Sequence, residues 1–432
     1  MSNITFFAKT DFRGADKTFG IKRNDRRYHT YVIGKTGTGK TTLLLNMILS
    51  DIFSGEGLAV MDPHGDLVEA ILDYIPKRRV NDMVYFNPGD IEYPISLNIL
   101  EDTEPERRHI IVSGLISVFR RIWKEFWGPR LEHIFRNSIL ALLEYPESTT
   151  LLAIQRMLSD RKYREKIIEK IDDPIVKTFW QKEFAGYHTR LQSEAISPIQ
   201  NKIGQFLATP LIRNIVGQTK TSIDFRSVMD EGKILICNLS KGRLGEENSS
   251  LLGSLIVTKL QLAAMGRIDT QEVARKDFYL YVDEFQNFVS TEIFSHILSE
   301  ARKYRLNLVM AHQYISQLDD SVREAVLGNV GTMISFRVGS SDAELLQDIF
   351  RSVFRSDDFM NLDRYMIYLR MAIDGKSSRP FSARTLPPFH SFEFQDSREK
   401  VIRASRQRYA GRREDMEGKI RRWVGGRKSI GL

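Results

Sequence analysis

The chain has 432 residues, of which 42% are hydrophobic and 27% are charged, so it is long enough for two or three domains with large cores. This composition excludes a disordered, collagen-like or low-complexity protein. The net charge is +8, and the single cysteine, Cys237, excludes a disulfide within the chain.

The chain begins with MSNITFFAKTDFRG, which lacks the apolar core of a signal peptide. No run reaches the roughly 18–20 uncharged apolar residues that a membrane-spanning helix needs. We therefore expect a cytoplasmic protein without an intrinsic membrane span, with peripheral binding at the inner face of the cell membrane as a further option.

Short apolar segments alternate with helical patterns along most of the chain, which is typical of an α/β fold with a mostly parallel central sheet. A hairpin is expected to turn at Asp374-Gly375. Cys237 lies within a predicted strand, so we expect a buried thiol rather than a nucleophile or metal ligand. The predicted strands are 31–33, 58–61, 83–86, 234–237, 278–282, 306–310 and 333–337.

The first of these strands leads into GKTGTGKT at 34–41, which fits the phosphate-binding pattern G-x-x-x-x-G-K-[ST] at every fixed position. The glycines let backbone N–H groups point at a phosphate, and the following helix adds its positive N-terminus. Lys40 is predicted to neutralise β- and γ-phosphate oxygens, and the Thr41 hydroxyl to bind Mg²⁺. The predicted contacts of ATP are Gly34, Thr36, Gly37, Thr38, Gly39, Lys40, Thr41 and Thr42. The alternative is a glycine-rich turn without a ligand.

Between residues 102 and 221 long helical patterns follow one another with few strand candidates, which predicts an all-α domain inserted into the nucleotide-binding core. The predicted divisions are 1–101 and 222–390 for the two parts of the core, 102–221 for the insertion, and 391–432 for a C-terminal tail.

The segment FYLYVDEFQN, 278–287, is an apolar strand that ends in two adjacent acids. In a phosphate-loop fold, Asp283 at the strand end would hold Mg²⁺, and Glu284 would polarise the attacking water. A pair of acids that caps the next helix is the alternative.

Two further side chains are candidates for hydrolysis. Gln313 follows another strand at the same edge of the sheet, where it is placed to orient water or to sense the γ-phosphate. Arg302 would complete the site of a neighbouring subunit as an arginine finger. A loop glutamine bonded to the backbone and a solvated arginine are the respective alternatives.

The excess positive charge lies at the C-terminus, where residues 397–432 contain twelve Lys or Arg and four acids. Such a basic segment is typical of an arm that binds the phosphates of nucleic acid or of anionic lipid. A solvated, partly helical end remains the alternative.

The motifs GKTGTGKTT, MDPHGDLV, VDEFQNF, ARKYRLNLVMAHQYISQL and NVGTMISFRVGSSDAELL, in this order, resemble the HerA/FtsK superfamily of phosphate-loop motors. Within it they are most similar to the TraG/TraD-type coupling proteins of type IV secretion and conjugation. The resemblance implies a RecA-like core, a hexameric ring and ATP-driven movement of DNA. It assigns Lys40 and Thr41 to the Walker A pair, Asp283 and Glu284 to the Walker B pair, Gln313 to the sensor and Arg302 to the trans arginine.

The resemblance also implies partners, namely DNA, a relaxase and components of a secretion channel. The aromatic side chains Trp123, Phe126 and Trp127 of the helical domain are placed either to stack on bases or to pack in its core. The chain begins almost directly at the nucleotide core, so it resembles members without transmembrane helices. Two other functions stay open, a HerA-like DNA motor with a nuclease partner and a secretion ATPase that does not contact DNA.

Overall fold

The computed structural model describes residues 3–11, 14–101, 104–288, 297–390 and 392–424, and the chain forms two compact units. The sheet unit consists of Met1–Phe86, Phe225–Lys241 and Leu260–Ser405. The helical unit consists of Asn87–Asp224, Gly242–Lys259 and Arg406–Leu432. Besides the predicted insertion, the helical unit therefore takes in part of a later helix and the end of the chain.

The sheet unit contains one sheet of eleven strands in the order β2-β1-β13-β10-β9-β3-β8-β7-β4-β6-β5. All seven predicted strands are present, with ends that differ by at most a few residues. Cys237 is fully buried in β6, as expected. The strands are β1 Ile4–Thr10, β2 Thr18–Lys22, β3 Thr30–Ile33, β4 Gly57–Asp62, β5 Met83–Phe86, β6 Ile234–Asn238, β7 Phe278–Val282, β8 Leu306–His312, β9 Thr332–Ser335, β10 Met366–Arg370 and β13 Phe381–Thr385.

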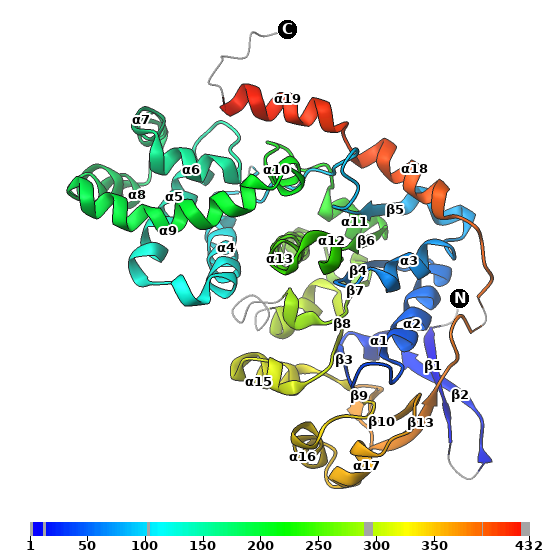
Figure 1. The fold of residues 1–432 in the computed structure, drawn as a ribbon. Coiled ribbons are helices and arrows are strands. Elements are labelled where there is room, and N and C mark those ends of the chain that lie inside the picture. The colour runs from blue at the N-terminus through cyan, green and yellow to red at the C-terminus, as the bar shows by residue number, and fades with distance from the viewer. Residues whose placement is uncertain (1–2, 12–13, 102–103, 289–296, 391, 425–432) are drawn as a thin grey trace. The chain divides into compact units, whose positions relative to one another are not determined.

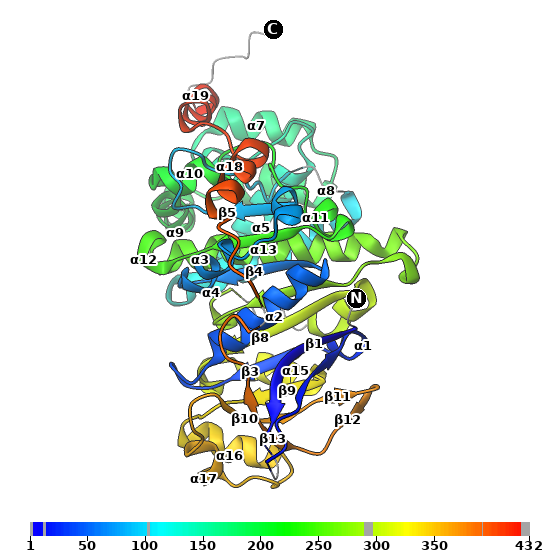
Figure 2. The same ribbon diagram turned by 90° about the vertical axis from the view of Figure 1, so that its right-hand side faces the viewer.

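Strands β9, β3, β8, β7, β4, β6 and β5 pair in parallel, which confirms the mostly parallel α/β fold. The remaining four strands are antiparallel and lie at one end of the sheet (Figure 2). The predicted turn at Asp374-Gly375 joins the short strands β11 Ala372–Ile373 and β12 Lys376–Ser377, and both turn residues have positive φ. The hairpin of β1 and β2 was not predicted.

Helices α2 and α3 cover one face of the sheet, and α15 lies on the other (Figure 1). The strand order accounts for this arrangement, because right-handed crossovers that move in opposite directions along a sheet place their helices on opposite faces. The helices within the sheet unit are α1 Arg23–Arg26, α2 Lys40–Ser54, α3 Asp66–Leu72, α11 Phe225–Glu231, α15 Asp320–Asn329, α16 Ser340–Ile349 and α17 Ser356–Met360.

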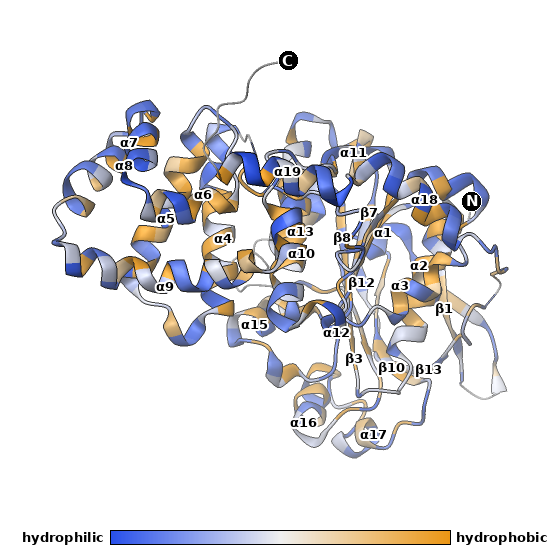
Figure 3. Ribbon diagram, turned by 45° about the horizontal axis from the view of Figure 1, so that its top comes forward, coloured by the Kyte–Doolittle hydropathy of each residue, from blue (hydrophilic) through white to orange (hydrophobic). Residues whose placement is uncertain are grey.

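The described residues between β5 and β6 form helices and loops without a strand. Helix α4 carries a broad apolar face, whereas α7 is mostly hydrophilic (Figure 3). Trp123 is 1% exposed and packs with Phe119, Phe135 and Phe206, so it belongs to the core. Phe126 is 59% exposed. The helices are α4 Arg108–Ile122, α5 Pro129–Glu144, α6 Leu151–Ser159, α7 Arg161–Lys170, α8 Pro174–Thr178, α9 Thr189–Ala208, α10 Pro210–Val216 and α19 Arg413–Val424.

Three further helices, α12 Lys241–Leu244, α13 Glu246–Gly266 and α18 Arg398–Tyr409, contain residues of both units. Among the described residues, the stretch Glu246–Asp269 is long and apolar enough to cross a membrane by length and composition alone. Its most apolar window is 78% buried within the protein, which is the usual environment of a core helix.

The basic C-terminal segment is folded as far as it is described. In the sheet unit, Val401 of α18 is fully buried, and the Tyr85 N–H of edge strand β5 donates to Ser405 Oγ at 2.8 Å. In the helical unit, Met416 and Ile420 of α19 are each 6% exposed. Apolar side chains therefore hold both helices in place, and the predicted binding of phosphates by this segment stays a prediction. Basic side chains that remain exposed are Lys400, Arg403, Arg406, Arg408, Arg412, Lys419, Arg421 and Arg422.

Candidate nucleotide site

The loop at 34–41 connects the end of β3 to the start of α2 and has the backbone of a phosphate-binding turn. Gly37 and Gly39 have φ values of 77° and 124°, which favour glycine. A Cβ atom on Gly39 would lie 2.7 Å from the Tyr365 ring. The tight curl that exposes backbone N–H groups therefore needs glycine at these positions.

Neighbouring strands hold this loop in place. The Lys35 N–H donates to the Arg337 carbonyl at 2.8 Å, just after β9. The Tyr365 N–H donates to the Thr38 carbonyl at 2.9 Å, just before β10. Thr38 Oγ1 also donates to the Lys35 carbonyl at 2.7 Å. These hydrogen bonds therefore fix the loop to the carboxyl edge of the sheet.

Lys40 is the first residue of α2 and is only 7% exposed. Its Nζ donates to the Gly34 carbonyl at 2.5 Å and to the Lys35 carbonyl at 3.2 Å. Burial lowers the pKa of Lys40, and the nearby Glu284 and Asp283 act against this shift. An ammonium group held by loop carbonyls beside two carboxylates is suited to phosphate oxygens.

The two acids of the predicted Walker B pair lie at the end of β7, on the carboxyl edge that also carries the loop. Asp283 and Glu284 are each 6% exposed. Burial, and then the charges of Glu284 and Asp62, raise the pKa of Asp283 to about 7, while Lys40 opposes the shift. Glu284 has a φ of 47°, which is uncommon for a residue with a side chain.

The carboxylate of Glu284 is held by two glutamine side chains. Gln313 Nε2 donates to Glu284 Oε1 at 2.8 Å, and Gln286 Nε2 donates to Glu284 Oε2 at 2.8 Å. Thr36 Oγ1 of the phosphate loop donates to Gln313 Oε1 at 2.9 Å. The structure therefore brings Glu284, Gln313 and the loop together as the sequence predicts. Gln286 was not predicted, although it follows Glu284 by two positions in VDEFQN.

Asp62, at the end of β4, is a third buried carboxylate at this edge. Its two oxygens accept the N–H groups of His64 at 2.8 Å and of Val68, in the first turn of α3, at 3.0 Å. Asp62 is also close enough to Asp283 that its charge raises the pKa of Asp283. Both oxygens of the Asp62 carboxylate therefore already accept hydrogen bonds from backbone N–H groups. Thr41, in contrast, is exposed.

The residues present fit Mg²⁺ only together with a nucleotide. The described part of the chain contains no group of three or more His, Cys, Asp or Glu that could hold a metal ion. Mg²⁺ in nucleotide sites commonly uses one or two protein oxygens, substrate phosphates and waters. The Thr41 hydroxyl and the Asp283 carboxylate would supply the protein oxygens here.

Arg302 lies at the opposite, amino edge of the sheet, in the short 3₁₀ helix η9 Ala301–Tyr304 that precedes β8. Gln313 follows β8 at the carboxyl edge. Seven strand residues separate the two ends, a distance of about 20 Å at roughly 3.3 Å per residue. Arg302 therefore cannot contact phosphates that are bound to the loop of its own chain.

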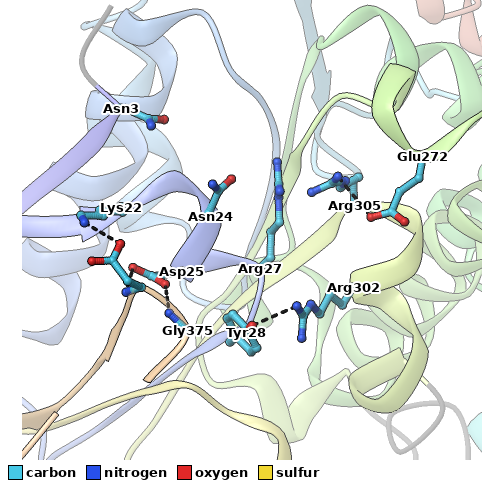
Figure 4. Close-up of a pocket in the computed structure, with 11 residues that line it drawn as sticks. Asn3, Lys22, Asn24, Asp25, Arg27, Tyr28, Glu272, Arg302, Arg305 and Gly375 are labelled. Atoms are coloured by element: carbon cyan, nitrogen blue, oxygen red, sulfur yellow. Dashed lines mark hydrogen bonds and ion pairs between the residues drawn. The ribbon is translucent and has the colours of Figure 1, made fainter. Parts of the chain in front are cut away.

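A cavity of about 390 Å³ lies at this amino edge (Figure 4). Three of its four basic side chains are paired with acids: Lys22 with Asp374, Arg27 with Asp277, and Arg305 with Glu272. Among the described residues, no carboxylate pairs with Arg302, which is exposed. The cavity is lined by Asn3, Lys22, Asn24, Asp25, Arg27, Tyr28, Glu272, Arg302, Arg305, Asp374 and Gly375.

The sequence of the chain matches a protein-family model and a curated relative. A family model described as the type IV secretion-system coupling protein DNA-binding domain matches residues 17–350. The type 4 coupling protein DotL of Legionella pneumophila is 20% identical over 381 residues. That alignment covers 74% of this chain and 48% of DotL, so the chain spans about half the length of this curated relative.

Solved structures share the fold. The bacterial conjugative coupling protein TrwBdeltaN70 superposes with a TM-score of 0.63 at 16% identity, covering 87% of this chain and 88% of that one. TrwB in complex with ADP and Mg²⁺ gives 0.62 at 15% identity, covering 88% and 89%. VirB4 of Thermoanaerobacter pseudethanolicus gives 0.56 at 14% identity, covering 89% and 97%.

Proposed function

This chain belongs to the family of type IV secretion-system coupling proteins, and on that premise we propose that it is an ATPase that hydrolyses ATP to bind and move DNA. The observation that carries the proposal is the hydrogen-bonded series from Thr36 through Gln313 to Glu284. It connects the phosphate loop to the Glu284 carboxylate, which we assign as the general base. The complex of the related TrwB with ADP and Mg²⁺ supports the same ligands for this chain.

In the proposed reaction, a water oxygen attacks the γ-phosphorus of ATP in line with the bond to the β-phosphate oxygen. Glu284 accepts a proton from this water, the new O–P bond forms, and the bridging O–P bond breaks to release ADP. Lys40 and the loop N–H groups neutralise the charge on the phosphate oxygens. Mg²⁺, held by Thr41 and Asp283, would add further positive charge there. Gln313 and Gln286 keep the Glu284 carboxylate oriented.

Arg302 is proposed to complete the site of a neighbouring copy. Its distance from its own phosphate loop excludes action within the chain, and it lacks a carboxylate partner among the described residues. An arginine supplied in trans stabilises the charge of the transition state. A closed ring, which we propose to be a hexamer, would give every phosphate loop such an arginine.

The helical unit and the exposed basic side chains of α18 and α19 are proposed to contact DNA. The matched family model is described as a DNA-binding domain, and it spans most of the helices of this unit. We propose a relaxase and a secretion channel as protein partners, with the chain acting at the cytoplasmic face of the membrane.

The test is ATPase activity of the purified protein with and without DNA. We expect stimulation by DNA, loss of hydrolysis in Glu284→Gln, and wild-type activity in the control Glu231→Gln, which changes an exposed carboxylate of the same unit. DNA affinity should fall steeply with salt, because bound phosphates release counterions. Hydrolysis that needs Glu284 but never responds to DNA would instead favour a secretion ATPase. Full activity of Glu284→Gln would refute the assigned base.

A further inference from the structure

The head group of Arg302 is held by a single aromatic side chain, Tyr28. Arg302 Nη2 donates to the Tyr28 hydroxyl at 2.9 Å, and the guanidinium carbon lies 3.9 Å from the centre of the ring (Figure 4). Tyr28 comes just before β3, and Arg302 just before β8, which is the strand beside β3. The contact therefore joins two segments that are 274 positions apart in the sequence.

Tyr28 is itself fixed from two directions. The Gly331 N–H donates to the Tyr28 carbonyl at 2.6 Å, and a Cβ atom on Gly331 would lie 2.5 Å from Tyr28 Cβ. A Cβ atom on Gly375 would lie 3.4 Å from the Tyr28 hydroxyl. The turn at Gly375 is held by Asp25, whose carboxylate accepts the Asp374 and Gly375 N–H groups at 3.0 and 2.9 Å. Tyr28 is therefore closely packed at its backbone by Gly331 and at its hydroxyl by the Gly375 turn.

The backbone on either side of Arg302 is also fixed. Arg267, which is fully buried, donates from Nη1 to the Tyr304 carbonyl at 3.0 Å. Arg275 donates from Nη1 to the Lys303 carbonyl at 2.5 Å. The Arg305 N–H donates to the Arg302 carbonyl at 3.1 Å. Both ends of the Arg302 side chain are thus positioned, while the guanidinium stays exposed at the cavity.

We propose that Tyr28 is a positioning residue that presents Arg302 to the nucleotide of the neighbouring copy. This inference rests on the proposed function, in which Arg302 acts in trans. The hydroxyl occupies one N–H donor of the guanidinium and leaves the others for phosphate oxygens. The ring restricts a side chain that would otherwise lose much rotamer freedom when it binds. A carboxylate in place of Tyr28 would neutralise the positive charge of Arg302 that stabilises the γ-phosphate. The neutral phenol of tyrosine leaves this charge intact.

The experiment compares kcat and KM for ATP in Tyr28→Phe, Tyr28→Leu and Arg302→Ala. The control is Tyr93→Leu, because Tyr93 also lies under an arginine, with Arg406 at 4.7 Å from the ring centre, but in the helical unit. Misplacement of a catalytic group by about 1 Å costs roughly 100-fold. We expect kcat to fall about 100-fold in Tyr28→Leu and less in Tyr28→Phe, which keeps the stacking, with KM unchanged.

Mixed rings separate a trans role from a purely structural one. Lys40→Ala subunits cannot use their own nucleotide but carry an intact Tyr28 and Arg302. Mixing them one to one with Tyr28→Leu subunits should restore about a quarter of wild-type activity, because each site combines two subunits of a random ring. Arg302→Ala subunits should be rescued in the same way.

The outcomes test the positioning role of Tyr28 separately from the trans action of Arg302. If Arg302→Ala is inactive and rescued by mixing, while Tyr28→Leu keeps wild-type kcat or is not rescued, the role of Tyr28 is overturned and the trans arginine stands. If Arg302→Ala keeps wild-type kcat or is not rescued, the trans arginine of the proposed function is refuted. Should Tyr28→Leu fail to fold, the same comparison applies to Tyr28→Phe, whose ring keeps the packing.

Discussion

Replacing Asp283 with Asn should stabilise the protein in the absence of nucleotide and metal, although it removes a proposed Mg²⁺ ligand. Asp283 is 6% exposed, and its pKa is raised from 3.8 to about 7 by burial and by the charges of Glu284 and Asp62. The ionised carboxylate is therefore unfavourable in the folded state. At about 1.4 kcal/mol per pKa unit, ionisation costs at most about 4 kcal/mol of stability.

The sign of the pH dependence follows from the raised pKa. Below about pH 4 the carboxyl is protonated in both the folded and the unfolded state, so it contributes no penalty. Between about pH 4 and 7 the unfolded chain releases the proton while the folded chain keeps it, and stability falls as pH rises. The advantage of Asp283→Asn should therefore be roughly a third of its full size at pH 5 and full at pH 8.

The assay is urea unfolding in EDTA without nucleotide at pH 5, 6, 7 and 8. Asp277→Asn is a matched control with the opposite sign. Burial opposes the charge of Asp277, but hydrogen bonds from Arg27 and Asn307 lower its pKa overall. Loss of this charge in Asp277→Asn should therefore destabilise the sheet unit at every pH of the series. If Asp283→Asn is less stable than wild type at pH 8, or its advantage does not grow with pH, the reasoning is refuted. Addition of Mg²⁺ and ATP should reverse the order, because only the wild type gains full ligand stabilisation.

Three further predictions concern other parts of the chain. Asp51→Ala should destabilise the sheet unit by about 3–5 kcal/mol in urea unfolding, because Arg26, paired with Asp51 at 2.6 Å and 2% exposed, would be left buried without a counter-charge; an unchanged midpoint would contradict this. Gln286→Ala should lower kcat up to about 100-fold with KM for ATP unchanged, since it frees one oxygen of Glu284; equal loss of nucleotide affinity would argue against a role in orientation. Replacing exposed basic side chains of α18 and α19 with Gln should weaken DNA binding and its salt dependence without loss of basal hydrolysis, whereas unchanged affinity would remove these helices from the DNA-binding surface. The substituted residues are Lys400 and Arg403 of α18 and Lys419 and Arg422 of α19. Deletion of 397–432 is a poor substitute, because it would remove Val401 from the core.

Much of the fold could be predicted because the parallel strands are short, apolar and bounded by clear turns. The edges of the sheet were harder. The hairpin of β1 and β2 pairs with β13 from the other end of the core, and such long-range pairing leaves little local pattern. The packing of the basic C-terminal segment was hard to predict for a similar reason. Its few apolar side chains, such as Val401 and Ile420, are sparse in sequence but coincide on one side of each helix.

The sequence by itself determined the phosphate loop and the paired acids, because each is a contiguous segment whose chemistry depends on neighbouring residues. Only the tertiary structure decided how these parts are connected. The hydrogen bonds from Thr36 to Gln313 and from Gln313 to Glu284 exist because β3, β8 and β7 are neighbours in space but not in sequence. The same strand order places Arg302 and Tyr28 together at the opposite edge. The physical reason is that a side chain's partners are set by strand order, which local sequence does not encode.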